Sequence, residues 1–384
     1  MMHESSEYMK KRLSTLIIIL TIIISNLAIS ASSTTSKLIT KNENFLYVGG
    51  SGPENYTKIQ NAVENASSDD TIFVFNGTYY ENVLINKSIQ LVGENEENTI
   101  IDGKDGLFSI SIKSQNVLIK HIKITNSSHD GIKISKNSDR TKILNCIIEK
   151  CQWMGVFIEN TENIIIDDCK FIDNLNGIGQ IDSNYSTINN CDFRNDQWNI
   201  IFWNSLFNKI LNCNINSNPE SDGIYLHGSR NNDIYNCTIS KIRDAISLYG
   251  YSSYNTIDKC KIIDIKNRGI LISEGIINKV SNTTIINCES GIEFYGDSFI
   301  GHDSELNEID NCLILKNSKY GILIMPDCNY NKVINCEISN NKYGLITQLD
   351  TYKNRIYNNE FIDNIEYQAY DARSEERRVG KECA

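Results

Sequence analysis

The sequence has very little proline and no excess of positive charge. Only 3 of its 384 residues are proline, which excludes collagen and proline-rich linkers. Lysine and arginine number 37 against 48 aspartate and glutamate, a formal net charge of −11, so the basic surface of a nucleic-acid-binding protein is missing. Hydrophobic residues make up 40% and charged residues 22%, which excludes both a disordered chain and a multi-span membrane protein.

Cysteine motifs for metal or redox chemistry are also missing. Of the 12 cysteines, no two have Cys-x-x-Cys spacing, which is typical of zinc and thiol–disulfide sites. Most of them recur at one position of a repeat. Stacked cysteines have parallel side chains, a poor geometry for disulfides, so we expect mostly free, buried thiols that pack as small hydrophobes. An exported protein would favour oxidation, and an anaerobic habitat would reconcile the two expectations.

Residues 1–30 are typical of an export signal. Residues 10–12 are basic, residues 16–24 form a short apolar core, and Ala28 and Ser30 supply the small residues of a cleavage site. We therefore expect an extracellular or cell-surface protein with no membrane span in the mature chain. An uncleaved signal anchor is the alternative.

Residues 373–384 break every pattern that precedes them. The segment has no isoleucine or asparagine, and it reads as the translation of a common sequencing-adapter oligonucleotide. We interpret it as an assembly artefact and expect the natural chain to continue past Ala372, so that the repeat region is truncated. A charged tail is the alternative.

One phrase recurs from about residue 116 onward: Asn-x-Ile-x-Asn-Cys-x-Ile, a polar stretch, then Gly-Ile-x-Ile. Its cysteine position recurs every 22–24 residues, with one interval of 29 that we attribute to a loop insertion at residues 296–305. Apolar residues alternate within each period, as Ile224 and Leu226 do, which indicates strands and not helices. A leucine-rich repeat of similar length would need a Leu/Asn consensus that is missing. The aligned positions are Ile122, Cys146, Cys169, Cys191, Cys213, Cys237, Cys260, Thr283, Cys312, Cys336 and Asn359.

These features predict an all-β fold, a right-handed, single-stranded parallel β-helix. Each coil of 22–24 residues would hold three short strands, and successive coils would stack about 4.8 Å apart. Residues 116–372 would form the repeats, and residues 31–115 the N-terminal cap and first coils. Within the cap, residues 56–66 have apolar positions at helical spacing and predict a short helix that covers the end of the first coil.

Asparagine usually precedes the repeated cysteine, and we expect this position to be structural. Asparagine tolerates the left-handed backbone of a sharp turn. Its amide can also bond the amide of the next coil, which would form an internal ladder. The predicted ladder comprises Asn145, Asp168, Asn190, Asn212, Asn236, Lys259, Asn282, Asn311, Asn335 and Asn358.

The order of these motifs resembles a known family. The pattern IQ-A-V-A…DTIFV..GTY-EN-V-I-KSI-L-G…TIIDG, followed by the Asn-Cys and Gly-Ile repeats, is similar to parallel β-helix repeat proteins of the pectin-lyase-like superfamily. Within it, residues 45–372 most resemble the NosD-type periplasmic copper-binding domain and the carbohydrate-binding and sugar-hydrolysis repeat domain. The resemblance implies the fold but no particular activity, because this scaffold hosts lyases, hydrolases, epimerases and adhesins.

The strand that begins with the Gly-Ile pair is predicted to carry aromatic side chains on its outer face. The second and fourth residues after the glycine point outward there. An exposed aromatic stripe usually binds a ligand, which here predicts a platform for sugar rings. A surface covered by the 296–305 loop or by a partner domain is the alternative. The predicted substrate-binding residues are Phe157, Trp198, Trp203, Tyr225, Tyr249 and Tyr295.

Asp222, Asp244 and Arg268 share the position before that glycine in three consecutive coils. Two carboxylates about 4.8 Å apart would push their pKa values apart, which suits an acid–base pair. Arg268 could hold the carboxylate of a uronic acid. With His227, these three are the predicted catalytic residues. The alternative is turn chemistry, with Arg268 neutralising Asp244.

The motifs of known enzymes are only partly present, so enzymatic activity stays open. SDGI around Asp222 resembles the polygalacturonase motif that carries one catalytic aspartate. The paired-Asp, Gly-His-Gly and Arg-Ile-Lys motifs of that family are missing, as is the Asp-Pro-His-Asp motif of mannuronan epimerases. An enzyme on this scaffold would be a polysaccharide lyase, glycoside hydrolase or epimerase.

The NosD resemblance implies copper, yet the sequence predicts no metal and no cofactor. Copper prefers clustered histidine, methionine or exposed cysteine. The candidates are scattered along the sequence and the repeated cysteines face inward. They are His121, His129, His227, His302, Met154 and Met325.

We therefore predict a secreted or cell-surface protein that binds a polysaccharide or cell-surface glycan, as a monomer or as part of a larger surface protein. A broader version of this prediction adds modification of the glycan. The alternatives are a non-enzymatic spacer or adhesin and, third, a NosD-like factor for copper-site maturation.

Overall fold

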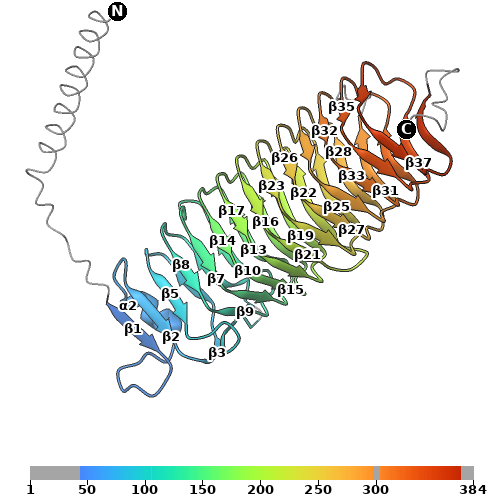
Figure 1. The fold of residues 1–384 in the computed structure, drawn as a ribbon. Helices are drawn as coiled ribbons and strands as arrows, with labels where there is room; N and C mark the ends of the chain where they lie inside the picture. Colours follow the sequence, from blue (N-terminus) through green and yellow to red (C-terminus); the bar gives the residue numbers. More distant parts are fainter. Residues whose placement is uncertain (1–43, 105, 297–302, 373–384) are drawn as a thin grey trace, which may run out of the picture. The chain divides into compact units, whose positions relative to one another are not determined.

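Parallel strands stacked along one axis form nearly all of the structure (Figure 1). The computed structural model describes residues 44–104, 106–296 and 303–372. The predicted export signal, the tail interpreted as an artefact (residues 373–384) and most of the 296–305 insertion lie outside these residues. No helix within the described ranges is long and apolar enough to cross a membrane.

Three parallel sheets, here called A, B and C, run the length of the stack. Sheet A has 14 strands, β1 (Phe45–Val48), β2 (Thr71–Val74), β5 (Gln90–Gly93), β8 (Leu118–Lys120), β11 (Lys142–Leu144), β14 (Ile165–Asp167), β17 (Thr187–Asn189), β20 (Lys209–Leu211), β23 (Asp233–Tyr235), β26 (Thr256–Asp258), β29 (Lys279–Ser281), β32 (Glu308–Asp310), β35 (Lys332–Ile334) and β38 (Arg355–Tyr357). Sheet B has 13 strands, β3 (Gly77–Tyr80), β6 (Thr99–Asp102), β9 (Lys123–Thr125), β12 (Ile147–Glu149), β15 (Lys170–Ile172), β18 (Asp192–Arg194), β21 (Asn214–Asn216), β24 (Thr238–Ser240), β27 (Lys261–Ile263), β30 (Thr284–Ile286), β33 (Leu313–Leu315), β36 (Glu337–Ser339) and β39 (Glu360–Ile362). Sheet C has 13 strands, β4 (Val83–Ile85), β7 (Phe108–Ile112), β10 (Asp130–Ile134), β13 (Met154–Glu159), β16 (Asn176–Ile181), β19 (Trp198–Trp203), β22 (Asp222–His227), β25 (Asp244–Tyr249), β28 (Arg268–Ser273), β31 (Ser290–Tyr295), β34 (Tyr320–Ile324), β37 (Tyr343–Thr347) and β40 (Tyr367–Asp371).

The predicted right-handed parallel β-helix is confirmed. Most strands pair with the strands three before and three after them in the sequence, as β22 does with β19 and β25, so each coil adds one strand to every sheet. The repeat period in the sequence is therefore the length of one coil.

The alternating pattern places the apolar residues inside. Ile224 and Leu226 of β22 are fully buried between the sheets, and Phe171 and Phe193 stack on adjacent coils with ring centroids 4.8 Å apart. The glycine of the Gly-Ile pair permits this tight stacking. A Cβ atom on Gly155 would lie 2.8 Å from the carbonyl oxygen of Gly177 in the next coil.

The predicted cap is present as helix α2 (Ile59–Asn65), which is shorter than the predicted range. Its buried face, formed by Ile59, Ala62 and Val63, packs on β1, β2 and β4 at the start of sheets A and C. Glu81 caps its first turn, because its two carboxylate oxygens accept the backbone N–H groups of Ile59 at 2.8 Å and Gln60 at 3.0 Å.

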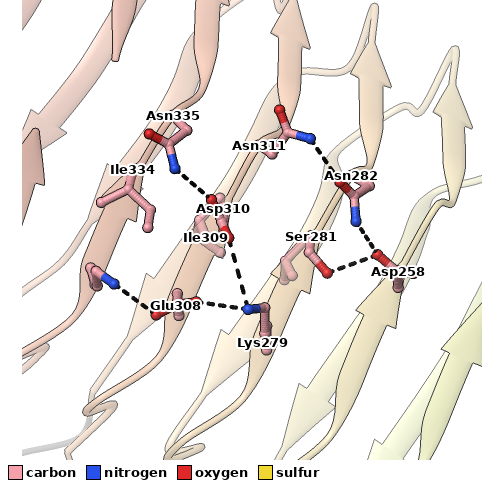
Figure 2. A network of polar contacts seen from close by, with 12 residues as sticks. Asp258, Lys279, Ser281, Asn282, Glu308, Ile309, Asp310, Asn311, Ile334 and Asn335 are labelled. Atoms are coloured by element: carbon pink, nitrogen blue, oxygen red, sulfur yellow. Dashed lines mark hydrogen bonds and ion pairs between the residues drawn. The ribbon is translucent and has the colours of Figure 1, made fainter. Parts of the chain in front are cut away.

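The turn from sheet A to sheet B has the predicted backbone but not the predicted ladder. All ten predicted positions have positive φ, between 49° and 55°. Their side chains, however, lie on the outside: Asn282 donates to Asp258 at 2.6 Å and Asn311 donates to Asn282 at 2.7 Å, and both bonds are exposed (Figure 2). The prediction of an internal ladder at this position is wrong, because the inward place in the turn belongs to the cysteine that follows.

The internal ladder lies in the turn from sheet C to sheet A, on the first asparagine of the repeat. Asn255 donates from Nδ2 to the Oδ1 atom of Asn278 at 3.1 Å and to the backbone oxygen of Ser229 at 3.0 Å. Its own Oδ1 accepts the backbone and side-chain N–H groups of Asn232, both at 3.0 Å. The buried members are Asn208, Asn232, Asn255, Asn278, Asn307 and Asn331.

This ladder also continues across the longest repeat interval. Asn278 donates to Asn307 at 3.0 Å although 29 residues separate them. The register of the ladder is therefore unchanged across this interval.

Cysteines line the inner side of the turn from sheet A to sheet B. All eleven cysteines of the described residues are buried and none is in a disulfide. Cys191, for example, donates from Sγ to the backbone oxygen of Asn189 at 3.2 Å. Burial raises the pKa of Cys151 and Cys288, which lie in the turn from sheet B to sheet C, to about 12 and keeps these two thiols in the unreactive protonated form.

Candidate functional site

The outer face of sheet C carries the aromatic side chains predicted from the sequence. Strand β22 shows the arrangement: Ile224 and Leu226 are buried, whereas Tyr225 and His227 are partly exposed. In register with them lie Ile201 and Trp203 on β19, and Ser247 and Tyr249 on β25.

Four rings on the outer face of sheet C form a continuous group, which we call the aromatic patch: Trp198, Tyr225, His227 and Tyr249. The Trp198 and Tyr225 rings meet edge to face with centroids 5.2 Å apart. Tyr225 and Tyr249 lie nearly parallel on adjacent coils at 6.0 Å, and His227 stacks against both at 6.3 and 6.5 Å. The Tyr225 hydroxyl lies 3.4 Å from Nδ1 of His227. The patch therefore offers four rings over three adjacent coils of the stack.

The other predicted aromatic residues lie on the same face but apart from the patch. Trp203 is in register with His227 and partly exposed. Phe157 lies beneath the ammonium group of Lys133, 5.5 Å from its ring centroid, and Tyr295 lies on β31, two coils beyond Tyr249. Trp203 therefore borders the patch, whereas Phe157 and Tyr295 extend the aromatic face farther along the stack.

Asp222 and Asp244 start consecutive strands and are joined through arginines. Nε of Arg243 donates to Oδ1 of Asp222 at 2.9 Å, and its Nη2 donates to Oδ2 of the same carboxylate. Arg268 donates to both oxygens of Asp244 at 2.9 Å. Arg243 also lies 3.8 Å from Asp244. We call these four residues the Asp–Arg cluster.

Burial sets the electrostatics of this cluster. Both carboxylates belong to residues that are 7% exposed. Burial raises the pKa of Asp222 above its usual range, although the Arg243 guanidinium opposes this shift and the neighbouring Asp244 supports it. In turn, Asp222 raises the pKa of Arg243, and Asp244 raises the pKa of Arg268. Arg268 neutralises Asp244, which was the structural alternative to its holding a uronate.

The structure does not bring His227 together with the other three predicted catalytic residues. Asp222 is the first residue of β22 and His227 the last. Five residues of extended strand span about 16 Å. The group that does lie beside Asp222 is Trp198, its register partner on β19.

Two contributors to this face were not predicted. Arg243 could not be found by comparing the repeats at the position of Asp222 and Asp244, because it stands one residue before that position. The one hint in the sequence is that a basic residue precedes the aligned Asp244. Trp153, which is 43% exposed, precedes β13 and stacks on His129 with centroids 5.5 Å apart.

Solved structures with a similar fold include carbohydrate-active enzymes. The mannuronan C-5 epimerase AlgE6 A-module of Azotobacter vinelandii matches with a TM-score of 0.60 and 12% identity, over 79% of this chain and 93% of that one. The catalytic domain of a GH87 alpha-1,3-glucanase matches with a TM-score of 0.59 and 14% identity, over 86% and 68%. The periplasmic alginate epimerase AlgG matches with a TM-score of 0.52 and 13% identity, over 79% and 84%.

At such low identity these likenesses establish the fold alone. This chain covers 56% of the length of one matching structure and 94% of another. No curated protein is significantly similar to the chain in sequence. A family described as "Periplasmic copper-binding protein (NosD)" matches residues 63–241 and 236–378.

Copper would need several imidazole, thioether or thiolate ligands close together. Within the described ranges, no three His, Cys, Asp or Glu side chains gather in a way that could hold a metal ion. His129 stacks on Trp153, and His227 stacks against Tyr225 and Tyr249. The described residues therefore do not fit a copper site.

Family membership rests on the extent of the match. The two matched segments overlap and together run from residue 63 to residue 378, which includes nearly every coil of the β-helix. The chain belongs to the NosD family.

Proposed function

We propose that the protein binds a polysaccharide along the outer face of sheet C, outside the cytoplasm. The observation that carries the proposal is the aromatic patch, in which ring faces on adjacent coils lie nearly parallel and partly exposed. Such rings offer sugar rings a large contact area at a low cost in conformational entropy. The carbohydrate-active neighbours in fold and the family's periplasmic description support the same conclusion.

Binding of the purified protein to an array of neutral and acidic polysaccharides tests this proposal. The decisive variant is Tyr249→Ala, because Tyr249 is 37% exposed and contributes contact area without filling the core. We expect it to weaken binding at least about tenfold with little change in Tm.

Tyr235→Ala is the matched control, since Tyr235 is also 37% exposed but lies on sheet A. It should bind like the wild type. Equal loss in both variants would contradict the proposal, and no binding to any polysaccharide would leave the spacer or adhesin interpretation.

A second candidate function, modification of the bound chain, rests on Asp222. Burial raises the pKa of this carboxyl group, which is the direction that a general acid needs, and Trp198 lies beside it in register. If the protein cleaves or epimerises its polysaccharide, Asp222→Asn should abolish turnover while binding survives. Asp233→Asn, which changes an exposed residue on sheet A, should keep full turnover.

A further inference from the structure

A groove lies farther along sheet C, where β34 and β37 begin. Seven residues line this lysine–tyrosine groove: Lys266, Glu289, Ser318, Lys319, Tyr320, Lys342 and Tyr343. None of them belongs to the aromatic patch or to the Asp–Arg cluster. Its tyrosines occupy the same strand position as Asp222 and Asp244, so the groove continues the row of residues in which that cluster lies.

The tyrosines at this position form a stack of their own. Tyr320 and Tyr343 are register partners with ring centroids 5.5 Å apart and planes inclined by 29°. Tyr343 and Tyr367 follow at 6.1 Å and 21°. Three ring faces therefore recur at one per coil, which suits a chain of pyranose rings laid along the stack.

Lysines flank these rings. Nζ of Lys319 lies 5.1 Å from the Tyr320 ring centroid, and Nζ of Lys342 lies 5.2 Å from that of Tyr343. Lys319 is 3.6 Å from Glu289, and Lys266 pairs with Glu220 at 2.5 Å. The groove lining holds three lysines and one glutamate, although the whole chain has a net charge of −11. Because Glu289 and Glu220 pair with two of these lysines, the surplus of positive charge over the groove is the one lysine Lys342.

We infer that the lysine–tyrosine groove binds a polysaccharide with negatively charged sugar rings, either uronates or sulfated sugars. The tyrosine faces would stack on the rings, and the lysine ammonium groups would pair with the carboxylates or sulfates. This inference rests on the proposed function, to which it adds the charge of the polymer. The groove begins three coils, or about 14 Å, beyond the Tyr249 strand, so one extended chain could contact both places.

The test measures binding of the full chain to polygalacturonate, dextran sulfate and neutral dextran at low salt. We expect the two anionic polymers to bind at least about tenfold more tightly than dextran, and the preference to weaken as salt screens the lysines. A preference for polygalacturonate would identify uronates, and a preference for dextran sulfate would identify sulfated sugars; either supports the inference.

Lys319→Gln with Lys342→Gln should remove the anionic preference. The matched control, Lys209→Gln with Lys261→Gln, removes the same charge from exposed positions on sheets A and B and should preserve it. Equal losses in the two double variants would overturn the inference, because they would show a general effect of net charge. Tyr343→Ala should weaken binding about tenfold and Tyr343→Phe should restore it.

Failure of this inference can be told apart from failure of the proposed function. If Tyr249→Ala weakens binding while both lysine double variants bind as the wild type does, the groove inference fails and the patch proposal stands. If neutral dextran binds tightly and the two anionic polymers do not, the groove inference also fails and the patch proposal stands. If no polysaccharide binds at all, both fail.

Discussion

The amide of Asn255 has all of its hydrogen-bonding capacity used by neighbouring coils. Asn255→Ala would take these partners from two backbone groups of the preceding coil, the N–H of Asn232 and the oxygen of Ser229. We therefore expect a loss of about 1–3 kcal/mol in the free energy of unfolding, measured by urea denaturation.

Asn214→Ala is the control for this prediction, because Asn214 lies in a strand and donates to Asp192 of the preceding coil on the outside at 2.7 Å. It should cost well under 1 kcal/mol. If the two variants lose the same stability, burial of the ladder is not what gives Asn255 its effect.

Asp196 is a buried carboxyl group without a cationic partner among the described residues. Its Oδ1 accepts the backbone and side-chain N–H groups of Asn174 at 2.7 and 3.0 Å, while its Oδ2 lacks a hydrogen-bond partner within that part of the chain. Burial raises the pKa of Asp196 to about 8. The folded state therefore holds a proton that the unfolded chain loses near its ordinary pKa of about 4.

Stability should consequently fall as pH rises from about 4 to about 8, because folding must either keep that proton or bury a charge. Asp196→Asn should remove this dependence and raise the free energy of unfolding at pH 8 by about 1–3 kcal/mol. Asparagine fits the position, since Asn174 and Asn341 donate there to a backbone oxygen of the preceding coil. Unfolding curves at pH 4 and pH 8 would contradict the prediction if the variant and wild type kept the same difference at both.

Among the elements, helix α2 depends on a single cap from outside the helix. Glu81 supplies acceptors for two backbone N–H groups of the first turn, 21 and 22 residues away in the sequence. Glu81→Ala should destabilise the protein by about 0.5–2 kcal/mol. Hydrogen exchange should rise in residues 59–66 while the middle coils stay protected. Glu96→Ala, which changes another partly exposed glutamate of the first coils, should leave exchange unchanged.

The strands could be predicted from the sequence because each buries alternate residues, and the repeat fixes which residues share a position. The backbone conformation of the turns could be predicted for the same reason. The sequence could not show which asparagine faces inward, because both asparagines of the repeat stand next to strands. Only the path of the turn decides between Asn208 and Asn212.

The candidate site was predictable only in part. The outward positions of sheet C follow from the strand period, which placed Tyr225 and Tyr249 on one face. The pairing of Asp222 with Arg243 depends on side-chain geometry between coils, and the distance from Asp222 to His227 depends on strand length. Neither the pairing nor the distance can be predicted from the sequence of a single repeat.

For the whole molecule, the buried cysteines predict an all-or-none reaction with thiol reagents. The eleven cysteines from Cys146 to Cys336 are buried, and burial keeps the thiol of Cys151 protonated by raising its pKa to about 12. Titration with a thiol reagent on residues 31–372 should count almost no thiols in native buffer and eleven in denaturant. Fewer than eleven in denaturant would mean that some are oxidised.

The direction of the strand pairing has a mechanical consequence. Hydrogen bonds between parallel strands lie across the strands and so run along the axis of the stack, from coil to coil. Tension along that axis would load the bonds of one coil at a time instead of shearing all of them together. A coil of about 23 residues occupies about 4.8 Å of the stack but extends to about 80 Å when it unravels. A pulled molecule would thus lengthen in regular steps of about 75 Å, one per coil, and act as an extensible tether whose remaining coils stay folded.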